Sequence, residues 1–346
     1  MQEYFRPIPN TDLARPATAL SLAGTWCWFD RVEVISRESN ATPHVIAAHD
    51  VPANILEYLT TPRATIAGLD FAKPKLMGIL NVTPDSFSDG GTHFELDAAL
   101  TGTREMIAQG AHLIDIGGES TRPGAQKIDS EEEIRRTAPV IEAIRAESAV
   151  PISIDTRKAP VARAAHNAGA DIVNDVAGFT FDPALAPFCA ERGLPVMVMH
   201  AKGTPDIMQE DPRYSHVALD VYDFLKERVD TLERLGVPRS KIVVDPGIGF
   251  GKTLAHNLTL LRNLSLFHGL GCPILLGASR KRFIGTLGGT DEARHRAPGS
   301  IGVALAGLAQ GVQMLRIHDV GATREAMQLW WAAIFEQPLN GEKQQV

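Results

Sequence analysis

The sequence predicts an α/β fold, a (β/α)8 TIM barrel preceded by an N-terminal extension, and three observations support this prediction. Eight short aliphatic runs recur after residue 74, and each ends in a polar residue. An amphipathic stretch with helical spacing follows each run, as in a repeated strand–helix unit. The 346 residues suffice for one barrel of about 250 residues and an appendage. A doubly wound open sheet is the alternative that this pattern leaves open.

The eight runs are rich in Ile, Val, Leu and Met and do not alternate with polar residues. Such runs are typical of strands that are buried on both faces of a parallel sheet. In chain order they are KLMGILNV, LIDIGG, PISIDT, IVNDV, PVMVMH, IVVDPG, PILLGAS and MLRIHDV.

The stretches between these runs are predicted helices, and two of them carry recognisable start signals. Ser130 is the expected N-cap of one helix, because Glu133 follows it at the spacing of a capping box. Asp182, directly before Pro183, is the expected start of another helix.

Residues 1–74 do not follow this rhythm and are expected to form an extension that packs on the barrel and stabilises it. Residues 24–36 are predicted to form one strand, with Trp26 and Trp28 on one face and Cys27 on the other. Residues 44–60 are predicted to form a strand and a short helix. The catalytic barrel is expected over 75–338, and residues 339–346 are expected to fray.

Composition and charge exclude several classes of protein. The net charge of −7, with both signs interspersed, argues against a general nucleic-acid binder. The three cysteines are scattered and form no CxxC pair, so neither a disulfide framework nor a zinc site is expected. No secretory signal and no membrane-spanning apolar run is present, which favours a cytoplasmic protein.

Polar residues at the predicted strand ends indicate a site. In a (β/α)8 barrel the catalytic groups lie where the strands end and the βα loops begin. One polar residue there could be a helix cap, but a full ring of them should surround a polar ligand, because unpaired buried polar groups cost about 1–3 kcal/mol each. The ring comprises Asn81, Asp115, Asp155, Asn174, His200, Asp245, Ser279 with Lys281, and Arg316 with His318.

The types of residue in this ring predict a mouth with two chemical halves. Carboxylates and an amide suit a heterocycle that presents several N–H groups, such as guanine or a pterin. Cationic side chains suit phosphate or pyrophosphate. The first group is Asp155, Asn174 and Asp245, and the second is Lys281, Arg316 and His318.

One stretch nearly matches two nucleotide-binding motifs. The stretch PGIGFGKT, residues 246–253, has Pro246 where a P-loop needs Gly, and Lys252 where GxGxxG needs its third Gly. Its glycines are expected to form a tight turn that brings Phe250 close to a ligand. His200 is left open between a structural and a functional role, and no His/Cys cluster marks a transition-metal site.

Taken together, the motifs resemble the dihydropteroate synthase family. The segments ILNVTPDSFSDGG, IDIGGESTRPGA, SIDT, NDVAGF, VMHAKGTPDIMQ, DPGIGFGKT, SRKRFIG and RIHDV occur in that family's order, across about residues 75–335. The resemblance implies a barrel enzyme, usually a homodimer, that condenses 6-hydroxymethyl-7,8-dihydropterin pyrophosphate with p-aminobenzoate. The products would be 7,8-dihydropteroate and pyrophosphate.

The resemblance also implies the roles of individual residues. The expected catalytic residues are Lys281, Asp155, Asp245, Arg316 and His318. The expected pterin site is Asp155, Asn174, Asp245, Lys281, Met199 and Gly277. The expected pyrophosphate site is Asn81, Thr121, Arg122, Arg316 and His318, with Mg²⁺ bound by Asn81. The expected p-aminobenzoate site is Phe87, Pro123, Phe250, Lys281 and Arg282.

Departures from the family pattern are few. Ala201 and Lys202 stand where relatives often have Met and Arg, and Arg282 stands where some relatives have Ser. Sulfonamide sensitivity is expected, because no residue is inserted beside Phe87. Two rivals keep the pterin pocket: a methyltransferase acting with a corrinoid protein, which should lack the loop motifs and the Arg/His pair, and a non-catalytic pterin-binding protein.

Overall fold

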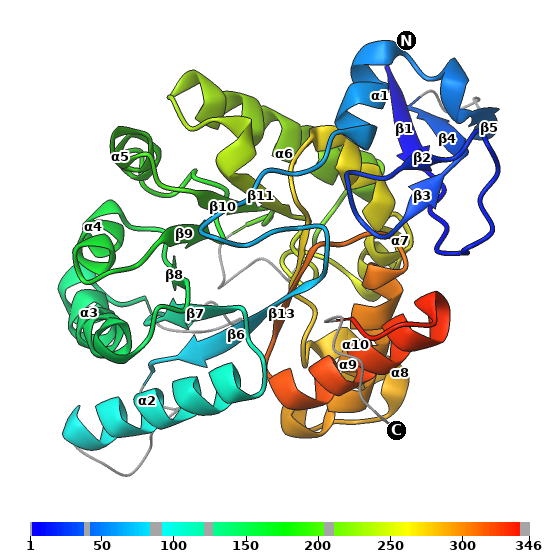
Figure 1. The fold of residues 1–346 in the computed structure, drawn as a ribbon. Coiled ribbons are helices and arrows are strands. Elements are labelled where there is room, and N and C mark those ends of the chain that lie inside the picture. Colours follow the sequence, from blue (N-terminus) through cyan, green and yellow to red (C-terminus); the bar gives the residue numbers. More distant parts are fainter. Residues whose placement is uncertain (1, 38–41, 84–91, 121–126, 204–210, 340–346) are drawn as a thin grey trace.

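Eight parallel strands form one closed barrel with helices around it (Figure 1). The structure, a computed structural model, describes residues 2–37, 42–83, 92–120, 127–203 and 211–339. The strands lie in the order β11-β10-β9-β8-β7-β6-β13-β12, and a parallel bridge between Val244 and Ile274 closes the ring. The predicted (β/α)8 barrel is therefore confirmed.

The strands coincide with the eight aliphatic runs, and most of their residues are buried. Their bounds are β6 Lys75–Asn81, β7 Leu113–Gly117, β8 Ile152–Asp155, β9 Ile172–Asp175, β10 Val196–Met199, β11 Ile242–Asp245, β12 Leu275–Leu276 and β13 Met314–Ile317. The helices outside them are α2 Thr92–Ala108, α3 Ser130–Glu147, α4 Ala159–Asn167, α5 Leu185–Arg192, α6 Val217–Arg234, α7 Leu254–Arg262, α8 Arg282–Gly288, α9 Ala297–Leu308 and α10 Val320–Phe335.

Both predicted helix starts are wrong in detail. Asp129, not Ser130, caps α3, because its carboxylate accepts from the Glu132 backbone N–H at 2.8 Å. Glu133 does not close a capping box, because its carboxylate instead binds Lys158 Nζ at 2.7 Å. Asp182 precedes a turn before α5, and its second carboxylate oxygen accepts from the first residue of α4, Ala159.

The floor of the barrel, its end at the N-termini of the strands, is filled by a turn from the extension. Ile66 and Leu69 pair across this turn, and with Phe71 they pack into a buried cluster of inward-facing strand residues. The strand residues of the floor are Met77, Leu113, Ile172, Met197, Val243, Leu275 and Met314.

The rest of the extension packs on the outside of the barrel near α6 (Figure 1). Its elements are β1 Glu3–Pro7, β2 Leu20–Ser21, β3 Trp28–Phe29, β4 Arg31–Ser36, β5 His44–Ala47, η1 Ala48–Asp50 and α1 Ala53–Thr60. Strands β1, β4 and β5 form an antiparallel sheet. Arg37 donates to Asp220 at 2.7 Å and to Asp223 at 2.6 Å, and both carboxylates belong to α6. That the extension serves only stability stays a prediction.

The strand predicted over residues 24–36 is divided in two. Ala23 and Gly24 have positive φ angles, 55° and 71°, and turn the chain, so extended pairing begins only at Trp28. Trp26 and Cys27 do not lie on opposite faces, because both direct a side-chain donor to the Leu308 carbonyl of α9. The predicted strand and short helix over 44–60 are confirmed as β5 and α1.

Among the described residues, no helix combines the length and the apolar character needed to cross a membrane.

Near the C-terminus, Leu339 is buried, and its carbonyl accepts from Lys73 Nζ at 2.6 Å.

Candidate active site

The polar layer of the mouth lies two residues beyond the floor on the same strands. Because side chains alternate between the two faces of a strand, residues two apart share the interior face. On several strands, a move of two residues along the strand therefore leads from the apolar layer of the floor to a polar layer. This mouth layer consists of Asp115, Asn174, Met199, Asp245, Gly277 and Arg316. Five of these were predicted site residues, and the structure brings them together.

Arg316 and Asp115 form the centre of this layer. Arg316 Nε donates to Asp115 Oδ2 at 2.6 Å, and its Nη2 donates to Asp155 Oδ2 at 2.9 Å. Ser153 Oγ donates to Asp115 Oδ1 at 2.6 Å, and Asn174 Nδ2 approaches the same carboxylate at 3.3 Å. Arg316 thus lies on the carboxylate half of the mouth, whereas the resemblance implied a role toward pyrophosphate.

Asp115 is the residue to which sequence reasoning assigned no role, although it belongs to the predicted polar ring. It is fully buried and is shared by three side chains of the mouth. The signal that could have found it is the two-residue step from Leu113, which places it on the same face as the other site residues.

Two carboxylates of the mouth, Asp155 and Asp245, have pKa values that are raised by burial. Burial raises the pKa of Asp155 to about 7, and the Arg316 guanidinium opposes this shift. Burial also raises the pKa of Asp245, against the opposing effect of Lys281. In the same way burial lowers the pKa of Lys281 to about 8, while Asp245 opposes the shift. The mouth therefore holds groups that change charge near neutral pH.

Lys281 and Phe250 lie together on the side of the mouth formed by the loop after β11. Lys281 Nζ lies 4.4 Å from the centroid of the Phe250 ring and donates to the Ile248 carbonyl. Gly277 borders Asp245 and Arg316, because a Cβ there would stand 3.4 Å from Asp245 Oδ2 and 3.9 Å from Arg316 Cβ. Arg282 follows as the exposed first residue of α8.

Asn81 and Asp155 lie on either side of Gly117 in the next layer of the barrel. The three residues are register partners on β6, β7 and β8. A Cβ on Gly117 would stand 3.6 Å from Asp155 Cβ and 3.9 Å from Asn81 Oδ1. Asn81 thus directs a hard oxygen donor toward this edge, which suits Mg²⁺ when phosphate oxygens complete its coordination. No group of three His, Cys, Asp or Glu side chains within the described ranges could hold a metal by itself.

His318 lies at the end of β13, where Ser279 contacts it twice. Ser279 Oγ lies 3.0 Å from His318 Nδ1 and accepts from the His318 backbone N–H at 3.2 Å. Next to them, Arg280 forms a two-point ion pair with Asp319, at 2.6 and 3.0 Å. These contacts tie the loops after β12 and β13 together.

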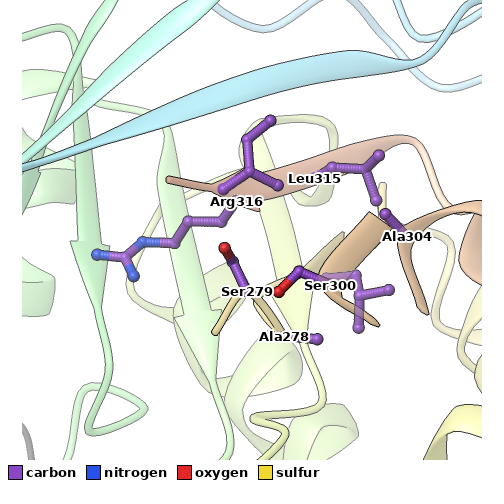
Figure 2. Close-up of a pocket in the computed structure, with 8 residues that line it drawn as sticks. Ala278, Ser279, Ser300, Ala304, Leu315 and Arg316 are labelled. Atoms are coloured by element: carbon purple, nitrogen blue, oxygen red, sulfur yellow. The ribbon is translucent and has the colours of Figure 1, made fainter. Parts of the chain in front are cut away.

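A small cavity lies behind the mouth, between β12, β13 and α9 (Figure 2). Its volume of about 10 Å³ is comparable to one water molecule, so it is no substrate site. Figure 2 shows that the Arg316 side chain extends away from this cavity toward the neighbouring strands. The lining residues are Leu276, Ala278, Ser279, Ser300, Ala304, Leu315, Arg316 and Ile317.

His200 has a structural environment. It is buried, its ring packs edge-on against Phe224 at 4.8 Å, and its Nδ1 lies 2.9 Å from Lys252 Nζ. Burial lowers the pKa of His200 to about 2, so the ring is neutral. The remaining predicted residues, Phe87, Thr121, Arg122 and Pro123, lie outside the described residues.

Comparisons with known proteins point to one family. A family model described as pterin binding enzyme matches residues 77–318. Dihydropteroate synthase of Escherichia coli is 46% identical over 261 residues, which cover 75% of this chain and 92% of the relative. That of Bacillus subtilis is 46% identical over 248 residues, 72% of this chain and 84% of the relative.

Solved structures give the same result. A Yersinia pestis dihydropteroate synthase with a sulfonamide drug aligns with a TM-score of 0.74 and 43% identity, covering 78% of this chain and 98% of that chain. The Xanthomonas albilineans dihydropteroate synthase in complex with 7,8-dihydropteroate aligns with a TM-score of 0.71 and 42% identity. The alignment covers 79% of this chain and 98% of that chain.

Proposed function

The chain belongs to the dihydropteroate synthase family of pterin binding enzymes, and from this premise we propose how its mouth divides the work of the reaction. It is an enzyme of folate biosynthesis that condenses 6-hydroxymethyl-7,8-dihydropterin pyrophosphate with p-aminobenzoate, giving 7,8-dihydropteroate and pyrophosphate. One observation carries the proposal: buried carboxylates and an amide share a single barrel mouth with Arg316, Lys281 and His318.

The carboxylate half of the mouth would bind the pterin ring. Asp155 and Asp245 can accept N–H bonds from the amidine-like edge of the ring, while Asn174 can both donate and accept. Lys281 would donate to a ring acceptor, and Met199 and Gly277 would leave a flat space between these groups. Asp115 would hold Asn174 and Arg316 in place within the same layer, since it contacts both.

The cationic half would bind pyrophosphate. His318 and Arg316 would donate to its oxygens, which requires Arg316 to exchange part of its contact with Asp155 for the anion. Among the residues that the structure describes, Asn81 would supply a protein oxygen to a magnesium ion that arrives with the pyrophosphate. When bound, this ion would neutralise charge that develops on the leaving group.

The reaction would be a displacement at the methylene carbon of the pterin. The carbon–oxygen bond to pyrophosphate breaks, and the bond pair leaves with the pyrophosphate oxygen. The p-aminobenzoate nitrogen supplies the pair for the new carbon–nitrogen bond and loses one proton. The buried carboxylates of Asp155 and Asp245 would stabilise positive charge on the ring during this exchange. No side chain needs to act as a nucleophile.

We also propose that the enzyme is a cytoplasmic homodimer. Neighbouring helices α9 and α10 carry apolar side chains that are partly or fully exposed, among them Ile301, Leu305 and Leu329, which is 65% exposed. Light scattering of the purified protein would give a mass of twice the 37.4 kDa chain.

The test of function is an assay of pyrophosphate release from the pterin pyrophosphate with and without p-aminobenzoate. Release should be fast only when the amine is present, and dihydropteroate should form in equal amount. Binding of the pterin without any release in the presence of amine would instead indicate a non-catalytic pterin-binding protein.

A further inference from the structure

Lys252 is a buried lysine that the proposed reaction does not use. It is the lysine of the stretch that nearly matches a P-loop, where a phosphate-binding role would require an exposed ammonium group. Instead its side chain is turned into the protein and is 3% exposed. Its Nζ contacts the Gly247 carbonyl at 2.8 Å, the Phe250 carbonyl at 2.9 Å and His200 Nδ1 at 2.9 Å.

These three contacts match the three N–H bonds of an ammonium group. An ammonium has three donors and no acceptor, so it fills all three contacts when Nδ1 of the neutral His200 ring is the acceptor. Burial lowers the pKa of Lys252 well below its usual value. The neutral amine fills the same three contacts, because it can donate to the two carbonyls and accept from the Nδ1–H of His200. The His200 carbonyl, at 3.3 Å, adds a fourth acceptor.

Two of the three acceptors belong to the turn that carries Phe250, and the third belongs to the residue after β10. The turn approaches β10 so closely that a Cβ on Gly247, whose φ is +67°, would stand 1.9 Å from the His200 carbonyl oxygen. Lys252 therefore joins the loop after β11 to the end of β10 from the inner side. From the opposite side, Lys281 meets the same turn at the Ile248 carbonyl and the Phe250 ring.

We propose that Lys252 is a positioning residue for Phe250: its side-chain amino group holds the turn Gly247–Gly251 against β10, so that the Phe250 ring stays beside Lys281 where p-aminobenzoate binds. This rests on the proposed function for the identity of the second substrate. Two of the pterin contacts, Asp155 and Asn174, are held by Arg316 and Asp115 and not by the turn. Asp245 and Lys281 also contact the turn, at the Gly247 N–H and the Ile248 carbonyl, but they lie on β11 and directly before α8, so binding of the pterin should weaken less than binding of p-aminobenzoate.

The test is Lys252→Met, which keeps most of the length of the side chain and removes its amino group. We expect the KM for p-aminobenzoate to rise at least about tenfold, which corresponds to about 1.4 kcal/mol. The Kd for the pterin pyrophosphate, measured by calorimetry, should change less than about threefold. If Lys252 had only a structural role, the variant would bind both substrates more weakly to a similar degree, or only its melting temperature would change.

Two further variants make the result specific. Lys241→Met is the matched control, because Lys241 also donates to a backbone carbonyl, that of Gly193 at 2.7 Å, but at the floor end of the barrel. This control should leave both the KM for p-aminobenzoate and the Kd for the pterin pyrophosphate unchanged. His200→Phe keeps a ring against Phe224 and removes one acceptor of Lys252, and it should raise the KM for p-aminobenzoate by about threefold. It also tests the proposal if Lys252→Met does not fold.

A crystal structure of the variant separates this proposal from the proposed function. In Lys252→Met the turn should move away from β10, and Lys281 should lose its contact with the Phe250 ring. A turn that keeps this contact, or equal losses for both substrates, overturns the role of Lys252. Absence of dihydropteroate synthesis by the unaltered enzyme would overturn the proposed function, while the position of Phe250 in the variant would still decide the role of Lys252.

Discussion

The mouth and the floor of this barrel are built from the same strands, only two residues apart, and they have opposite chemistry. On β7 the step is from Leu113 to Asp115, and on β11 it is from Val243 to Asp245. The floor is an apolar cluster closed by Ile66, Leu69 and Phe71. The mouth contains buried charges that interact with one another.

The difference separates stability from activity along the barrel axis. Apolar burial at the floor contributes roughly 25 cal/mol per Å² removed from water. Burial of charges at the mouth destabilises the fold instead, because taking an ion out of water costs several kcal/mol unless partners compensate. The floor thus supports a mouth that is unfavourable for folding until ligands bind. Substitutions at the two ends should therefore fail in different ways.

The largest expected effect is at the floor. Phe71→Ala should lower the free energy of unfolding by about 3–5 kcal/mol, because it leaves a cavity in a closed apolar cluster. Urea unfolding measures this loss, and the KM values of the folded fraction should stay within about twofold. Phe181→Ala, at a 45% exposed phenylalanine, should cost less than about 1 kcal/mol. A floor variant with normal stability would show that the turn does not seal the barrel.

The next effect is at the mouth and should have the opposite character. Lys281→Ala should lower kcat/KM by about 10²–10³, equivalent to about 3–4 kcal/mol of the barrier. The free energy of unfolding should be unchanged or slightly higher, since a half-buried ammonium is removed. Steady-state kinetics and urea unfolding of the same preparation test both statements, with exposed Lys226→Ala as the control. Loss of stability without loss of activity would contradict the division between the two ends.

Much of this division could be predicted from the sequence, because it lies in local patterns. The eight aliphatic runs and their polar ends predicted the barrel, and the position of Asn174 and Asp245 at strand ends placed both at its mouth. Asp115 was assigned no role because its importance depends on partners that are far away in the chain, Asn174 and Arg316. The position of Lys252 was also hidden, since its acceptors are backbone carbonyls that no side-chain pattern reveals.

Other errors arose where a distant contact overrides a local preference. Glu133 was expected to cap its own helix, but it is buried against Lys158, 25 residues later. The seal formed by Ile66, Leu69 and Phe71 is too short and irregular to have a period. Nothing in a single sequence says that a loop will fill the end of a barrel formed by later residues.

The pH dependence of stability should sharpen the comparison from the side of the mouth. The pKa of Asp155 is raised from 3.8 to about 7, so between these values the folded protein holds a proton that the unfolded chain has lost. Stability should therefore fall as the pH rises from about 4 to 7. Asp155→Asn should remove this part of the slope, as measured by urea unfolding across that range. An unchanged slope would mean that Asp155 is already ionised in the folded protein.

The smallest effect is expected at the rim, where a mouth residue is exposed to solvent. Arg282 begins α8, beside Lys281, and its charge is in water, so it should attract the carboxylate of p-aminobenzoate only weakly. Exposed ion pairs contribute about 0.2–1 kcal/mol and are screened by salt. Arg282→Ser should therefore raise the KM for p-aminobenzoate by about two- to fivefold at low ionic strength, and the difference should shrink when salt is added. Arg282→Lys, which keeps the charge, should stay near the unaltered enzyme. A change that is large, or that salt does not reduce, would show that Arg282 makes a buried contact and belongs to the inner mouth.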